Sequence, residues 1–84
     1  VQVLVADAQR LLNEGRHDEA IRRARQAMHE RKSPAAYAVE TRALCAMGDA
    51  EGARRAFSRV LGSEREPTIA ACTERGIQLA ATPR

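Results

Sequence analysis

Few residues of this chain could do acid–base, nucleophilic or metal chemistry. Its two histidines, His17 and His29, lack cysteine or carboxylate partners at the spacings that zinc sites use. The two cysteines, Cys45 and Cys72, both fall in stretches with helical periodicity, where cysteine is more often a small buried apolar residue than a nucleophile. We therefore expect no catalytic residue, no metal ion, no cofactor and no disulfide framework.

Two short acidic clusters could supply the paired carboxylates of a general acid–base mechanism. Asp18 and Glu19 form one cluster, and Glu64 and Glu66 form the other. Each stands at the start of a predicted helix, where negative charge complements the positive end of the helix macrodipole. Because that role explains both clusters, the sequence favours a protein that is not an enzyme.

Arginine supplies most of the positive charge. Of the 14 basic residues 13 are arginine, and the formal net charge is +3. Acidic residues are interleaved with them, whereas nucleic-acid-binding proteins usually gather their basic residues on one face. Ion pairs one helical turn apart, such as Glu51–Arg55, are typical of a solvated helix surface. Two arginine clusters keep an anionic partner, nucleic acid included, open as an alternative: Arg22, Arg23 and Arg25, and Arg54, Arg55 and Arg59.

The apolar composition indicates helices that pack closely on helices. Alanine contributes 17 of the 84 residues, whereas Leu, Ile, Val and Phe together contribute 15. A core of such small side chains needs backbones that approach closely, which favours helices over a β-sandwich. No apolar run reaches the roughly 18 residues of a membrane-spanning helix, so no membrane insertion is expected. Because the chain begins at Val1 rather than at methionine, we expect a piece of a longer protein. We further expect that this longer protein is bacterial.

The chain matches itself when it is shifted by 33 residues. A period of this length is typical of stacked supersecondary units. The matching residues include Gly15 with Gly48, Ala20 with Ala53, Pro34 with Pro67, and Arg42 with Arg75.

Helical periodicity within each unit predicts five helices and no strand. Glycine tolerates the left-handed conformation after a helix end, Ser and Asp accept hydrogen bonds from the first turn, and proline suits the first helical position. The expected ends are Gly15 and Gly48, the expected caps are Asp18, Ser33 and Asp49, and the expected opening prolines are Pro34 and Pro67.

Two segments, Gly15 to Met28 and Gly48 to Leu61, resemble the turn and second helix of tetratricopeptide repeats. The small residue early in that helix is Ala20 in the first segment and Ala53 in the second. Phe57, four positions after Ala53, is the large apolar residue of the pattern. The resemblance implies an all-α fold of antiparallel helix–turn–helix repeats in a right-handed superhelix. It also implies one domain over residues 1–84, with repeat one at about 1–33, repeat two at about 34–66 and a capping helix at about 67–81.

The same resemblance implies a non-catalytic scaffold that binds a partner protein or peptide in a concave groove lined by the first helices. Arg42 and Arg75 stand at equivalent repeat positions, so their guanidinium groups are expected to form a ladder suited to an acidic segment. The family's groove positions correspond to Gln9, Asn13, Arg42, Cys45, Arg75 and Gln78.

Two alternatives remain open at this stage. The apolar start of the chain, with Val1, Leu4 and Val5, predicts a module that associates with another copy and makes a homo-oligomer of its parent. The arginine clusters predict a nucleic-acid-binding helical domain, which we rank below both other readings. The sequence does not fix the compartment, and a cytoplasmic protein is the default expectation.

Overall fold

The computed structural model describes residues 2–30 and 33–79, in which helices are joined by short turns and no strand occurs. The predicted all-α class with five helices is confirmed. No helix in these two ranges is long and apolar enough to cross a membrane. The helices are α1 (Gln2–Asn13), α2 (His17–Glu30), α3 (Pro34–Ala46), α4 (Ala50–Phe57) and α5 (Arg65–Thr73), with a short 3-10 helix, η1 (Gly62–Glu64), before α5.

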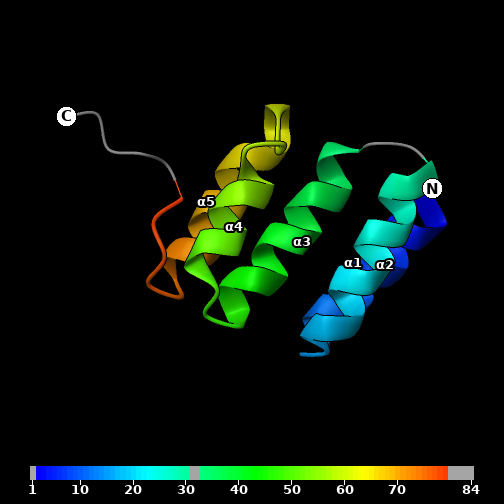
Figure 1. The fold of residues 1–84 in the computed structure, drawn as a ribbon, viewed down its shortest axis with the longest axis horizontal. Helices are drawn as coiled ribbons and strands as arrows, with labels where there is room; N and C mark the ends of the chain where they lie inside the picture. Colours follow the sequence, from blue (N-terminus) through cyan, green and yellow to red (C-terminus); the bar gives the residue numbers. More distant parts are fainter. Residues whose placement is uncertain (1, 31–32, 80–84) are drawn as a thin grey trace.

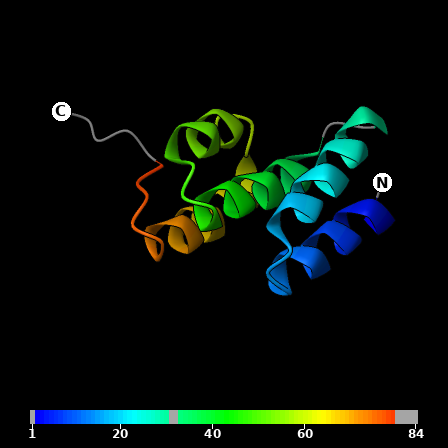
Figure 2. The same cartoon turned by 60° about the horizontal axis from the view of Figure 1, so that its bottom comes forward.

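The helices form a stack in which α3 is central. Sequence neighbours pack as hairpins, α1 on α2 and α3 on α4, while α3 also contacts α1, α2 and α5. Figure 1 shows α3 between the α1–α2 hairpin and the pair formed by α4 and α5. Figure 2 shows the same order after rotation, with the α1–α2 hairpin at one end and the C-terminal segment at the other. The first helices α1, α3 and α5 therefore share one side of the stack.

Glycines end these three first helices in the same way. Gly15, Gly48 and Gly76 have positive φ angles of 82°, 82° and 80°. After α1, the N–H of Arg16 donates to the carbonyl of Leu11 at 2.9 Å, and the equivalent bond follows α3 and α5. This is the Schellman arrangement, which satisfies carbonyls that a helix end leaves without partners.

Side-chain caps start α3 and α4 as predicted. The hydroxyl of Ser33 accepts a hydrogen bond from the N–H of Ala36 at 3.4 Å. Asp49 caps α4 in the same way, at 2.9 Å. The predicted cap of the second helix is wrong, because α2 begins at His17 and Asp18 lies inside its first turn.

The predicted bounds of the fifth helix, about 67–81, are wrong at both ends. Helix α5 begins two residues earlier and ends at Thr73, because Gly76 turns the chain into the left-handed conformation. Residues 80 and 81 lie outside the described ranges. Beyond the helix, Ile77 and Leu79 are only 8% and 7% exposed, and the side chain of Arg54 donates to the carbonyl of Gln78 at 2.9 Å. This segment packs back on the stack instead of continuing the helix.

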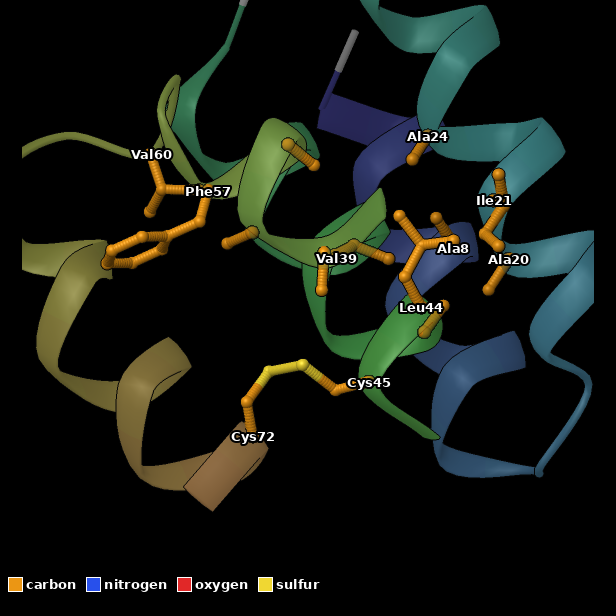
Figure 3. Packing of buried hydrophobic residues seen from close by; sticks show 14 of the residues in the cluster. Ala8, Ala20, Ile21, Ala24, Val39, Leu44, Cys45, Phe57, Val60 and Cys72 are labelled. Atoms are coloured by element: carbon orange, nitrogen blue, oxygen red, sulfur yellow. A yellow bond between two sulfur atoms is a disulfide. The ribbon is translucent and has the colours of Figure 1, made fainter. Parts of the chain in front are cut away.

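The core is built from small side chains with one large aromatic ring. Ala20 and Ala53, the small positions of the resemblance, are fully buried, as are Ala8 and Ala24. Phe57 is 4% exposed and fills the region between α4 and α5 (Figure 3). The alanines let neighbouring helices approach closely, as the composition predicts.

A disulfide joins Cys45 of α3 to Cys72 of α5, so the expectation of no disulfide is wrong. The two Cα atoms lie 5.3 Å apart, within the range that disulfides require. Both residues are buried, at 2% and 0% exposure, and Figure 3 shows the bond spanning the two helices. A helical position does not prevent pairing when two helices pack side by side.

Candidate functional site

A pocket of about 330 Å³ lies where the first helices of the stack meet. Helix α1 contributes Asn13, α3 contributes Arg42 and Ala46, and α5 contributes Ala71. The turn after α5 contributes Arg75. We call this hollow, lined by α1, α3 and the end of α5, the first-helix pocket.

The structure brings three of the six predicted groove residues into this pocket: Asn13, Arg42 and Arg75. Cys45 is bonded to Cys72 and 2% exposed, which leaves almost none of its side chain for a partner. Neither Gln9, half-buried on α1, nor the exposed Gln78 after α5 lines the pocket. Partner contact by any of the six stays a prediction.

The two arginines do not occupy equivalent helical positions. Arg42 lies within α3, whereas Arg75 lies two residues beyond the last residue of α5, Thr73. The predicted ladder along successive helices is therefore replaced by two guanidinium groups that approach one pocket, one from a helix and one from a turn.

Arg42 carries a buried donor without an acceptor. Its Nε is buried and makes no hydrogen bond to the residues that the structure describes. Such donors are rare in folded proteins, because leaving one unpaired costs about 1–3 kcal/mol. A planar guanidinium group is suited to a carboxylate, which can accept two parallel hydrogen bonds from it. Because Arg42 also lines the first-helix pocket, its guanidinium group is a candidate partner for an anion there.

The charge of the pocket favours an anionic ligand. Arg42 and Arg75 face a single carboxylate, that of Glu74, and neither arginine forms an ion pair with the described residues. His17 also lines the pocket. The sequence did not predict Glu74 and His17 as pocket residues, because the groove positions were placed by the repeat period within the first helices. Glu74 directly follows α5, and His17 is the first residue of α2.

The arginines of α2 and α4 are mostly engaged within the chain. Of the six side chains in the two clusters, those of Arg22 and Arg55 alone make no ion pair, hydrogen bond or ring contact to the described residues. The predicted Glu51–Arg55 pair is accordingly not formed. The engaged groups are Arg23 with Asp7 at 3.3 Å, Arg25 with Glu40 at 2.9 Å, Arg54 with the Gln78 carbonyl at 2.9 Å, and Arg59 over the Tyr37 ring at 5.9 Å.

Asp7 links α1 to α2 through two arginines. Its Oδ1 accepts a hydrogen bond from Arg10 at 2.5 Å, and its Oδ2 lies 3.3 Å from a terminal nitrogen of Arg23. The hydrogen bond from Arg10, with added attraction to Arg23, lowers the pKa of Asp7 below its usual 3.8. The group therefore stabilises the fold while it is ionised.

We expect Asp7→Asn to weaken the acid sensitivity of the fold. Because the folded-state pKa of Asp7 is lowered, its contribution is fully present above 3.8 and is lost as the pH falls through the lower folded value. Urea unfolding of both chains at neutral pH and below pH 3.8 measures this, and the wild-type chain should lose more stability on acidification. Asp18→Asn is the matched control, since Asp18 has no ion pair among the described residues. Equal acid sensitivity of the Asp7→Asn and wild-type chains would contradict the assigned role.

Metal chemistry has little support in the described residues. Within 2–30 and 33–79, no three His, Cys, Asp or Glu side chains gather in a way that could hold an ion. His29 is exposed at the end of α2, and both cysteines are in the disulfide.

Comparison with known proteins identifies the repeat. The family model described as tetratricopeptide repeat matches residues 6–72, which is more than half of the chain. Members of this family are generally protein–protein interaction scaffolds and are typically not catalytic. No curated protein and no solved structure matches the chain.

Proposed function

Because the chain belongs to the tetratricopeptide repeat family, we propose that it is a non-catalytic scaffold that binds an acidic segment of a partner protein in the first-helix pocket. The observation that carries this proposal is that Arg42, whose buried Nε lacks an acceptor, lines the pocket together with Arg75. A carboxylate in the pocket is attracted by both guanidinium groups.

The other lining residues suit an extended peptide. The amide of Asn13 both donates and accepts, so it can pair with a peptide backbone that crosses the end of α1. Ala46 and Ala71 are small and leave the space between the arginines open. Glu74 disfavours a second carboxylate close to the first, so the preferred ligand presents one acidic group here and others further along.

The proposed binding unit includes both repeats and the last helix, over the predicted single domain of residues 1–84. Helix α3 belongs to the second repeat and contacts α1 of the first and α5 beyond it. The pocket draws residues from all three helices, so a single repeat could not form it.

Self-association remains the leading alternative. Val3 is 81% exposed on α1, and Leu4 and Val5 beside it are half-buried, while Val1 lies outside the described residues. An exposed apolar side chain at this end suits contact with another copy. Nucleic-acid binding has less support, because most arginines of the two clusters already have partners within the chain.

Charge reversal in the pocket tests the proposal. We expect Arg42→Glu with Arg75→Glu to weaken binding of fluorescein-labelled Asp- and Glu-rich peptides at least about tenfold, because charged hydrogen bonds contribute about 1.5–3 kcal/mol each. Fluorescence anisotropy measures the affinity, with Asn- and Gln-substituted peptides as the uncharged comparison. Circular dichroism confirms that the variant is folded.

Arg22→Glu with Arg55→Glu is the matched control, since it changes the net charge equally at two arginines that have no partner in the described chain. This control should bind acidic peptides nearly as well as the wild-type chain. An equal loss in both variants would show attraction to net charge alone. Failure of every acidic peptide to bind the wild-type chain would overturn the proposed ligand class.

A further inference from the structure

We propose that the first-helix pocket is competent to bind its acidic segment only while the Cys45–Cys72 disulfide is closed. This inference rests on the proposed function and adds a condition to it. The disulfide joins α3, which carries Arg42, to α5, which leads into the turn that carries Arg75.

The position of the bond supports this coupling. Ala46 and Ala71, which line the pocket, are the sequence neighbours of Cys45 and Cys72. Arg42 stands about one helical turn before Cys45, and Arg75 follows Cys72 by a similar distance in sequence. Each arginine is therefore held within a turn of one sulfur atom, so their relative placement depends on how firmly α5 is fixed to α3.

Without the bond, α5 has modest means of holding that position. It has nine residues, too few for a helix to be stable by itself. It packs chiefly on α3 and on η1, which directly precedes it. The hydroxyl of buried Thr68 is used within this segment, donating to the Glu64 carbonyl at 2.7 Å. At the start of the helix, Arg65 places its guanidinium group over the Phe57 ring and donates to the Val60 carbonyl at 2.9 Å. Further along, the ties include partly buried Ile69 and the segment after the helix, with buried Ile77 and Leu79 and the hydrogen bond of Arg54 to the Gln78 carbonyl.

Opening the bond is a two-electron reduction. A dithiol transfers two electrons and two protons, the sulfur–sulfur bond breaks to give two thiols, and the dithiol is oxidised to its own disulfide. Because Cys45 and Cys72 are 2% and 0% exposed, a reductant reaches them only when α5 moves away from α3. A ligand that binds the closed pocket disfavours that movement, so it should protect the disulfide. The requirement fits a protein of an oxidising compartment rather than the default cytoplasmic expectation.

The test measures, at low temperature, how tightly three forms of the full chain bind one acidic, fluorescein-labelled peptide. The forms are the oxidised chain, the chain reduced with dithiothreitol, and the variant Cys45→Ala with Cys72→Ala. We expect the peptide to bind the latter two at least about tenfold more weakly. Reoxidation of the reduced chain should restore binding, whereas the alanine variant should not respond to oxidant. An excess of the peptide should also slow reduction of the oxidised chain by dithiothreitol, measured by thiol alkylation and mass spectrometry.

Hydrogen–deuterium exchange locates the change. The reduced chain should lose protection over residues 65–79 and keep it in α1 and α2. Equal peptide affinity in all three forms would overturn this inference and leave the proposed function standing. Absence of binding to the oxidised chain would instead remove the proposed function itself. Loss of protection throughout every helix of the reduced chain would show a general loss of folding and overturn the local coupling.

Discussion

Replacing Cys45 and Cys72 by alanine is expected to lower the free energy of unfolding by about 2–4 kcal/mol. The bond closes a loop between residues 27 apart in sequence, and its loss returns conformational freedom to the unfolded chain. Domains of this size lose about 4–8 °C of melting temperature for each kcal/mol, so the melting temperature should fall by roughly 8–32 °C. Thermal unfolding followed by circular dichroism measures the change.

Reduction of the wild-type chain provides the control for this variant. With dithiothreitol present, the wild-type and alanine chains should melt at similar temperatures, because the remaining difference is only the truncation of two buried thiols. If the oxidised and reduced wild-type chains melt together, the disulfide does not contribute to stability in the way that its position implies.

Phe57→Ala should have the second large effect, a loss of about 3–5 kcal/mol in the free energy of unfolding. Phe57 is 4% exposed, belongs to the main core cluster, and packs its ring 4.3 Å from the guanidinium carbon of Arg65. Removing the ring opens a cavity in the close-packed core, which the surrounding side chains fill only in part. Urea unfolding of the oxidised chain measures the loss, and Phe57→Leu should cost less because it retains much of the volume.

Leu61→Ala is the matched apolar truncation. Leu61 lies a few residues further along but is 59% exposed, so its loss should change stability little. A Phe57→Ala chain as stable as the Leu61→Ala chain would contradict the packing described for α4 and α5.

Much of the helical order could be predicted because it depends on local chemistry that the sequence states directly. Ser33 and Asp49 each stand directly before a stretch with helical periodicity and cap the helix that follows. Gly15 ends the first helix. The early end of α5 could not be predicted from the repeat, since the 33-residue period places the corresponding position further on. Gly76 is the local signal for the end of α5, because glycine favours the left-handed conformation that follows a helix. The repeat period contradicts this signal.

The pocket was less predictable, because it depends on distances between helices. The helical stretches around Cys45 and Cys72 predict two buried, unpaired cysteines. Helical periodicity does not indicate how close α3 and α5 lie, so it could not predict the disulfide. Arg42 and Arg75 were paired by sequence position and do share a pocket, although one of them stands outside its expected helix. The buried Nε of Arg42 has no sequence signal, since it results from side-chain packing.

The central claim, that an acidic segment binds in the first-helix pocket, is tested most directly by nuclear magnetic resonance of the oxidised, nitrogen-15-labelled chain during titration with an acidic peptide. We predict that backbone chemical shifts change at Asn13, Arg42, Ala46, Ala71 and Arg75. The side-chain Nε–H resonances of Arg42 and Arg75 should move as well, with the shift change at Arg42 among the largest. Shift changes concentrated instead at Arg22 and Arg55, with the pocket resonances unmoved, would contradict the claim.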